Sequence, residues 1–223
     1  MVRKLAAAGD NTVYFTYSSS GEAAEKLSAE FPGCHGIHCD FTDAGAVGRL
    51  TASIGEMSPE VLINNAALPF EKRYFHKTES REFSSGFEKN ILPVIKITEA
   101  SVNAFRKNKS GKIITILSSA IIGKPPIGWS EYVAGKNYLL SLSKSWATEN
   151  IKFNITSNCI SPSFMETRFT GDTDPRMVEQ MVNDHPLKKL LTPQEVADTV
   201  FFLVYCSRHI NGINLVMNAG SDL

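Results

Sequence analysis

A tyrosine and a lysine in the stretch SEYVAGKNYLL have the types and spacing needed for acid–base chemistry. Tyr132 and Lys136 are four residues apart, so in a helix their side chains lie on one face. A phenol has an unperturbed pKa of about 10 and is a poor proton donor or base near neutral pH. An ammonium group held close favours the phenolate and lowers that pKa. We therefore expect this pair to exchange a proton with a substrate near neutral pH.

A serine just before this helix supplies a third polar group. Ser119 ends a predicted strand over 112–119, thirteen residues before Tyr132. Small ligands bind at the carboxyl ends of the strands in open α/β sheets. The Ser119 hydroxyl could therefore hydrogen-bond the oxygen of a carbonyl undergoing reduction. A tyrosine–lysine pair alone is weak evidence, but after a strand that ends in two serines it is specific.

The chain alternates short apolar strands with longer amphipathic helices. Strands are predicted at 12–17, 34–40, 60–65, 112–119, 153–160 and 213–218. Helices are predicted at 2–8, 21–31, 43–56, 80–108, 130–150 and 194–207. This alternation predicts an α/β fold with a doubly wound, mostly parallel sheet, in a single domain over residues 1–223. The segment 163–192 fits the alternation least, and we interpret it as a lid over a substrate pocket or as an ordinary surface excursion.

Charge and hydropathy argue against several classes of partner. The chain has 23 basic and 23 acidic residues, a formal net charge of 0. Without a basic stripe, neither nucleic acid nor a membrane is expected as a partner. The sequence contains no apolar stretch of about 18 residues and no signal peptide. These features predict a cytoplasmic protein.

The four cysteines do not predict a metal site. Cys34 and Cys39 flank His35 and His38, but in a strand these two histidines point to opposite faces. The cysteines are interpreted as small buried side chains in a reducing compartment.

Six motifs in consistent order resemble the short-chain dehydrogenase/reductase family over nearly the whole chain. YVAGK with the preceding Ser119 is similar to the family's serine, tyrosine and lysine arrangement. The other motifs are CDFTD with Asp40, VLINNAA with Asn64 and Asn65, FEKNILPVIKIT with Asn90, NCISPSFMET with Pro162 and Thr167, and INGINLVMNAG.

The resemblance implies roles for these residues. Tyr132 would exchange the proton with the carbonyl or alcohol, Lys136 would lower its pKa and hold the nicotinamide ribose, and Ser119 would orient the substrate oxygen. Asn90 would hold a water that links Lys136 to solvent. The residues expected to bind the cofactor are Tyr17, Ser18, Ser19, Asp40, Phe41, Asn64, Asn65, Ala66, Tyr132, Lys136, Pro162, Phe164 and Thr167.

The sequence departs from the family pattern at three places. Ala67 and Ser163 stand where the family has glycine, and either would add strain if its backbone needed a positive φ. The third departure is at the N-terminus. Residues 1–9 resemble the end of the family's first helix, so its first strand and glycine-rich loop are missing from the chain as given. The start could lie at an internal methionine, another segment or partner chain could fill the gap, or the protein could be a cofactor-free relative.

The resemblance further implies a cofactor and a substrate class. The end of the second family strand reads Tyr17-Ser18-Ser19, and the absence of an acidic residue there favours NADP(H) over NAD. The overall pattern is most similar to 3-oxoacyl-acyl-carrier-protein reductases, which implies an acyl-carrier-protein-linked substrate and a role in fatty acid or polyketide synthesis.

Other readings and partners remain open from the sequence. The chain could instead be a non-catalytic subunit that completes a heteromer, or a dehydrogenase of another secondary alcohol. The long helices resemble those that pair subunits in this family and imply a homodimer or homotetramer. Side chains that could line an acyl site or contact an acidic carrier protein are Trp129, Phe164, Met165 and Phe169, and Lys124, Arg168, Arg176, Lys188 and Lys189.

Overall fold

The computed structural model describes residues 1–9, 11–171 and 173–221. The strands are β1 (Val13–Tyr17), β2 (Cys34–His38), β3 (Val61–Asn64), β4 (Gly111–Ile116), β5 (Ile155–Pro162) and β6 (Asn214–Met217). The α-helices are α1 (Val2–Ala6), α2 (Gly21–Glu30), α3 (Ala44–Met57), α4 (Ser80–Gly86), α5 (Leu92–Asn108), α6 (Ser130–Asn150), α7 (Pro175–Asp184) and α8 (Pro193–Tyr205). All pairings of these strands are parallel, which confirms the predicted α/β class.

The parallel strands form two sheets. One sheet pairs β1 with β2, and the other has the order β3-β4-β5-β6. In the larger sheet Ile114 of β4 lies opposite Asn158 of β5. If the β1 edge of the small sheet is set beside the β3 edge of the large sheet, the strand order is that of a doubly wound sheet. The described residues do not supply the strand that such a sheet has between β1 and β3.

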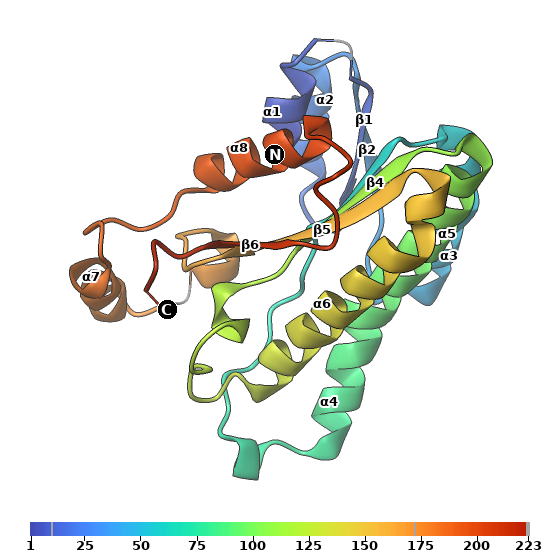
Figure 1. The fold of residues 1–223 in the computed structure, drawn as a ribbon. Helices are drawn as coiled ribbons and strands as arrows, with labels where there is room; N and C mark the ends of the chain where they lie inside the picture. The colour runs from blue at the N-terminus through green and yellow to red at the C-terminus, as the bar shows by residue number, and fades with distance from the viewer. Residues whose placement is uncertain (10, 172, 222–223) are drawn as a thin grey trace.

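Helices cover both faces of the larger sheet (Figure 1). On one face α5 and α6 pack against β4 and β5, and α3 packs on α5. On the other face α8 packs against β4 and β5, and α1 lies against α8. Ile114, Ile160 and Val200 form the centre of the α8 side and are 0–1% exposed. Strands covered on both faces are expected to be largely apolar, but β4 and β5 also bury polar side chains such as Lys112, Thr115 and Asn158.

The two inner strands β4 and β5 are far better buried than β1 and β3. Every residue of β4 and β5 is buried. In β1 the residues alternate between half-buried and exposed, with Tyr14 at 46% exposure, and Val61, Leu62 and Ile63 of β3 are half-buried. The part of the scaffold that contains β4 and β5 is therefore more completely packed than the part that contains β1 and β3.

The predicted helix over 80–108 is one helical run with an interruption. A π-helical turn, η2 (Phe87–Ile91), separates α4 from α5. Such turns are rare, and they occur most often at functional sites. The predicted continuous helix is therefore interrupted at the position of Asn90, a predicted site residue that lies within η2.

The helix boundaries follow the capping signals. α8 begins at Pro193 after a capping box in which Thr192 accepts from the Glu195 N–H and the Glu195 side chain accepts from the Thr192 N–H. Hydrogen bonding by Thr192 holds the pKa of Glu195 at about 2. Gly9 closes the first helical segment with a φ of 97°, a conformation that glycine adopts without strain.

The two departures from glycine carry no backbone strain. Neither Ala67 nor Ser163 has a positive φ, so the strain considered for these positions does not arise. Among the described residues, no helix is long and apolar enough to cross a membrane.

Candidate active site

Tyr132 lies in the first turn of α6, enclosed by other aromatic rings. Phe70 stacks on it with ring centroids 4.5 Å apart and an interplanar angle of 18°. Trp129 meets it edge-on at 5.4 Å, and Phe169 lies 6.2 Å away. The rings come from three separate segments, so packing between them fixes the position of the half-buried phenol.

Lys136 lies one turn further along α6 and is buried. Its Nζ donates to the carbonyl oxygen of Ile116, the last residue of β4, at 2.8 Å. The same nitrogen lies 5.8 Å from the centroid of the Tyr132 ring. Burial lowers the pKa of Lys136 to about 8, because the charged form is poorly solvated there. The predicted pairing of both side chains on one helix face is confirmed.

The pKa of Tyr132 moves opposite to the expected direction. Burial raises the pKa of Tyr132 above its ordinary value, and a hydrogen bond with the Ser118 side chain only partly offsets this. Lys136 directs its ammonium to a backbone carbonyl, so it does not lower the phenol pKa as expected. The raised pKa means that Tyr132 is protonated near neutral pH.

Two serines, Ser118 and Ser119, follow β4, and the turn that begins at Ser119 packs against α6. The Ser118 side chain hydrogen-bonds with Tyr132 and accepts from the Ala120 N–H at 3.2 Å. Ser119 begins the 3-10 turn η3 (Ser119–Ile121), and its carbonyl accepts from Ile122. Strand β4 ends at Ile116 rather than at 119, so neither serine lies within the strand. The role expected of Ser119 stays a prediction, and Ser118 is a second candidate for it.

Asn90 lies beside the tyrosine–lysine pair because of the π-helical turn. Its Oδ1 accepts from the Leu68 N–H at 2.7 Å, which fixes the loop that follows β3. The same asparagine lines the cavity that Tyr132 and Lys136 line. The structure therefore brings together Ser118, Tyr132, Lys136 and Asn90.

The predicted cofactor residues fall into two groups. Tyr17 ends β1 and is followed by Ser18 and Ser19, and Asp40 and Phe41 follow β2, all at the carboxyl end of the small sheet. Asp40 accepts from the Thr42 N–H and hydroxyl at 2.8 Å, which lowers its pKa. At the carboxyl end of the larger sheet lie Asn65, Ala66, Pro162, Phe164 and Thr167.

Asn64 is placed differently from the other predicted cofactor residues. Its side chain is buried, and its Nδ2 donates to Thr98 at 3.1 Å and to Thr115 at 3.4 Å. These bonds tie β3 to α5 and β4. Asn64 therefore holds the scaffold, and Asn65 is the exposed residue of the pair.

A buried hydroxyl at the end of β5 fits a nicotinamide ring nearby. The Ser163 Oγ is buried and has no hydrogen-bond partner among the described residues, although the Ser163 N–H donates to Met217 at 2.9 Å. Leaving a buried hydroxyl unpaired costs about 1–3 kcal/mol, which a ligand amide would recover. The nicotinamide end thus fits, whereas the described residues supply no glycine-rich turn for a pyrophosphate.

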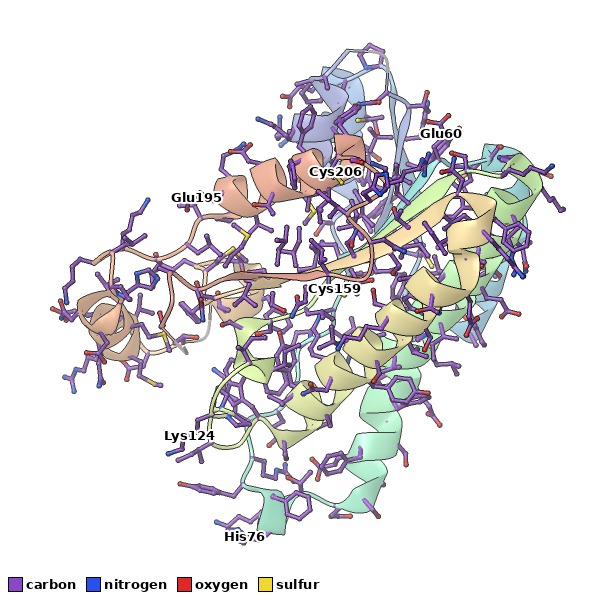
Figure 2. The ribbon with its side chains drawn as sticks, viewed as in Figure 1. Glu60, His76, Lys124, Cys159, Glu195 and Cys206 are labelled. Atoms are coloured by element: carbon purple, nitrogen blue, oxygen red, sulfur yellow. The ribbon has the colours of Figure 1, made fainter. Side chains whose placement is uncertain are left out.

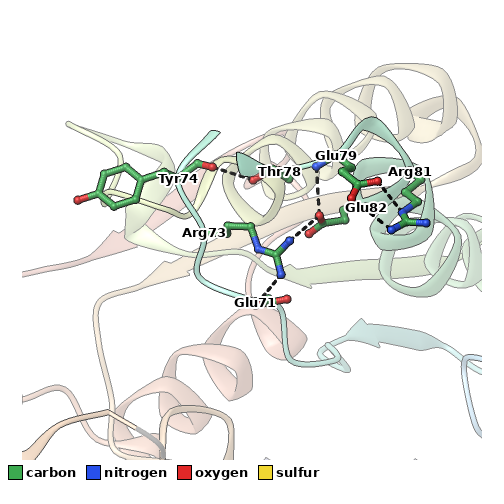
Figure 3. Close-up of polar contacts among 7 residues, drawn as sticks. All are labelled: Glu71, Arg73, Tyr74, Thr78, Glu79, Arg81 and Glu82. Carbon is green, nitrogen blue, oxygen red and sulfur yellow. Dashed lines mark hydrogen bonds and ion pairs between the residues drawn. The ribbon is translucent and has the colours of Figure 1, made fainter. Parts of the chain in front are cut away.

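Two cavities adjoin the site. The larger, of about 530 Å³, lies between the segment after β3, helix α4 and the start of α6. Its wall is held by a charged cluster in which Arg73 pairs with Glu71 and Glu82, and Arg81 pairs with Glu79 (Figure 3). The smaller, of about 30 Å³, is lined by Tyr132 and Lys136.

Phe70 is a site residue that the sequence reasoning missed. It stacks on Tyr132 and also meets Trp129 edge-on at 5.0 Å. Trp129 and Phe169 were expected to line an apolar acyl site, and both lie in this aromatic cluster. Phe164 and Met165 are half-buried. The signal for Phe70 was its place after NNAA, where a loop must return across the strand ends.

Within the segment 163–192, helix α7 stands away from the body of the protein. Helix α7 has no buried residue, and Met177 is 53% exposed; Figure 1 shows it separated from the helices that cover the sheet. Lys124, in the loop before α6 (Figure 2), Arg176, Lys188 and Lys189 are exposed, and Lys189 pairs with Glu195 at 3.2 Å. The Arg168 side chain lies outside the described part of the structure.

Comparisons with known proteins agree with this geometry. A family model described as enoyl-(acyl carrier protein) reductase matches residues 1–222. The 3-oxoacyl-[acyl-carrier-protein] reductase MabA of Mycobacterium bovis is 31% identical over 100% of this chain and 87% of its own length. The 2,3-dihydro-2,3-dihydroxybenzoate dehydrogenase of Bacillus subtilis is 27% identical over 100% of this chain and 90% of its length.

A solved structure shares the fold. It is provisionally assigned as a betaketoacyl-ACP reductase and superposes with a TM-score of 0.83 at 24% identity, covering 98% of this chain and 90% of its own. The family match, the strand order and the Ser118, Tyr132, Lys136 and Asn90 arrangement agree. The chain therefore belongs to the short-chain dehydrogenase/reductase family and is an oxidoreductase of the ketoreductase type.

Proposed function

We propose that this oxidoreductase uses NADPH to reduce the 3-oxo group of an acyl thioester carried by acyl carrier protein. The observation that carries the proposal is the position of Tyr132 and the buried Lys136 one turn apart on α6, with the Lys136 ammonium bound to the carboxyl end of β4. Relatives named for this reaction, such as MabA at 31% identity, support the substrate class.

Each group in the site has a step that its position supports. The Ser118 hydroxyl would hydrogen-bond the carbonyl oxygen, which becomes more negative as the reaction proceeds. Tyr132, whose burial favours the protonated phenol, would donate its proton to that oxygen. Lys136, with a pKa of about 8, can then return a proton. Bound dihydronicotinamide supplies the hydride.

The preference for NADPH is supported by the residues after β1. Tyr17, Ser18 and Ser19 present hydroxyl groups where a carboxylate would select the 2′-hydroxyl of NADH. Ser18 and Ser19 are exposed, so a 2′-phosphate could reach both. The cytoplasmic location stays a prediction.

The apolar walls support an acyl substrate. Phe70, Trp129 and Phe169 surround Tyr132, and an acyl chain would displace or pack against these rings. Lys124, in the loop before α6 (Figure 2), and Arg176, on α7, are exposed and could contact an acidic carrier. Enzymes that act on different alcohols share this fold, so a dehydrogenase of another secondary alcohol is the second candidate.

An assembly of two or four chains remains part of the proposal. Phe87 and Tyr138 are 37% and 45% exposed and contact each other edge-on at 5.3 Å across η2 and α6. An exposed aromatic pair on the outer helices suits an interface. The division of the strands into two sheets supports a further possibility, that a second reductase-like chain completes the sheet.

A substrate panel tests the proposal. The full chain would be incubated with NADPH and either a 3-oxoacyl thioester on acyl carrier protein, the same thioester on a small thiol, or simple ketones and sugars. We expect the carrier-linked thioester to give the highest kcat/KM. Equal or higher values for a simple ketone would favour the second candidate. No turnover with any substrate, by a folded chain that binds NADPH, would support a non-catalytic subunit.

A further inference from the structure

The two cavities beside the active site share one wall. In the described structure four residues line both cavities, namely Leu68, Phe70, Asn90 and Glu131. Leu68 and Phe70 are apolar, and an asparagine amide does not titrate. Glu131 is therefore the residue of this shared wall that can take up and release a proton.

Glu131 is held in this wall by close packing against α4. A side-chain carbon added at Gly86 would lie 1.9 Å from the Glu131 Oε1, so the carboxyl group occupies space that only glycine leaves free. Burial raises the pKa of Glu131. A raised carboxyl pKa brings proton exchange closer to neutral pH.

The neighbouring charges do not neutralise Glu131. The cleft is also lined by Glu71, Arg73, Arg81, Glu82 and Lys89. Arg73 is engaged by Glu71 and Glu82, and Arg81 by Glu79 (Figure 3). Among the described residues, Glu131 makes no ion pair within 4 Å. On the inner side, Lys136 and Tyr132 line the small cavity that Glu131 also lines.

The small cavity can hold water between these groups. Its volume is about 30 Å³, and roughly 10–15 Å³ is enough for one water molecule. Lys136 and Asn90 offer donors there, while the Asn90 Oδ1 is already committed to Leu68. The geometry suits a proton that moves from Glu131 through water to Lys136.

We propose that Glu131 passes protons between solvent in the 530 Å³ cleft and the water space beside Lys136. This rests on the proposed function. For each carbonyl reduced, the carbon gains a hydride from NADPH and the oxygen gains the Tyr132 proton. The phenol O–H bond re-forms with a proton supplied by way of Lys136, and Glu131 takes its replacement from solvent. Glu131 acts through Lys136 and does not touch the substrate.

Restoration of turnover by a small carboxylate buffer would distinguish a proton-transfer role of Glu131 from a structural role. Glu131→Ala should lower kcat roughly tenfold with little change in KM, and formate at constant ionic strength should restore part of it, because formate can enter the cleft. Glu71→Gln, a carboxylate change confined to the large cleft, should behave as the wild type. Unchanged kcat in Glu131→Ala, or a loss that formate does not restore, would overturn the proposal.

A second measurement does not require turnover. The infrared band of the Glu131 carboxyl group is identified as the band that disappears in Glu131→Gln. This band would be titrated with pH in the free protein, with and without the Lys136→Met substitution. We expect its midpoint above the ordinary carboxyl value, and a further rise when the Lys136 charge is removed. If the wild type fails to reduce any substrate, the proposed function fails, and this titration still decides whether the two groups are coupled. No shift on removing Lys136 would overturn the coupling.

Discussion

The strands that carry the catalytic groups and the strands expected to carry the adenosine end of the cofactor differ in support. β4 and β5 are buried along their whole length, between α8 on one face and α5 and α6 on the other. β1 and β2 form a separate two-stranded sheet with exposed residues in both strands. Two-stranded sheets are marginally stable unless other elements cover them.

This difference shows that separate parts of the scaffold support the catalytic residues and the residues expected to bind the adenosine end of the cofactor. Ser118 and Lys136 are both fixed to the end of β4, through chain connection and through the Ile116 carbonyl. Tyr17, Ser18 and Ser19 depend on β1, whose strand partner in the described structure is β2. We therefore expect changes in the first region to alter turnover, and changes in the second to alter cofactor affinity.

Replacing Tyr132 should have the largest effect. Tyr132→Phe removes the proton donor and retains the ring that stacks on Phe70. General acid catalysis is worth about 10²–10⁴-fold, so we expect kcat to fall about 10³-fold while NADPH affinity changes less than about threefold. Steady-state rates and a nicotinamide fluorescence titration would check this. A variant that loses affinity instead would break the division between the two regions.

Hydrogen exchange should separate the two sheets without any ligand. Amides of β4 and β5 are expected to exchange only through global unfolding, whereas those of β1 and β2 open locally. We expect exchange at least about 10²-fold faster in β1 and β2, measured by mass spectrometry of proteolytic fragments. Equal protection in both sheets would mean that they unfold as one unit.

The serine assignment gives the next largest effect. Ser118→Ala should lower kcat about 10²-fold, the loss expected for one hydrogen bond to a developing oxyanion. Ser119→Ala is the matched control, because Ser119 starts η3 and Ser118 bonds with Tyr132. We expect it to lose less than about threefold. Reversed effects would restore the assignment made from residue spacing alone.

Lys136 should limit stability as well as support turnover. Its pKa of about 8 against an ordinary 10.5 means that the folded state binds the proton more weakly than the unfolded state. The destabilisation is full below pH 8 and disappears as the pH rises toward 10.5. Lys136→Met should therefore raise the free energy of unfolding at pH 7 by about 2 kcal/mol, after the lost bond to Ile116 is subtracted.

Urea denaturation at several pH values would test this. The gain for Lys136→Met should shrink as the pH rises from 8 toward 10.5, because the penalty on the charged lysine is lost over that range. A gain that does not change with pH would show that packing, and not the buried charge, sets the difference.

The smallest effect is expected at the cofactor end. Ser18→Asp places a carboxylate where a 2′-phosphate is expected, so NADPH affinity should fall about tenfold while NADH affinity holds or rises. Ser18→Asn, which adds similar bulk without charge, is the control. Fluorescence titrations of both variants with NADPH and with NADH would measure the ratio of the two affinities. A ratio unchanged from the wild type in Ser18→Asp would contradict the assignment of Ser18.

The sequence predicted the elements well where the apolar pattern was strong. The helix over 130–150 has these bounds in the structure, and the Tyr132 and Lys136 spacing placed both side chains in one site. The same pattern could not show that β4 ends at Ile116, before the predicted end at 119. The end of a strand depends on pairing with its neighbour, here the Leu117 N–H on Ile160, and this is a tertiary contact.

The remaining misses have the same origin. The π-helical turn that positions Asn90 leaves no mark on the apolar spacing. Phe70 reaches Tyr132 through a loop whose path the sequence does not specify. The pKa direction of Tyr132 depends on burial and on the orientation of Lys136, and neither follows from a four-residue spacing. Contacts between distant segments decided each of these points.

A fluorescence titration of the full folded chain with NADPH, followed by addition of a 3-oxoacyl thioester, tests most directly whether this site is a working reductase. We expect NADPH to bind with micromolar affinity and its fluorescence to disappear as the thioester is reduced, while Tyr132→Phe binds NADPH without oxidising it. Failure of the folded wild-type chain to bind NADPH, or equal oxidation by Tyr132→Phe, would contradict the proposed role of the site.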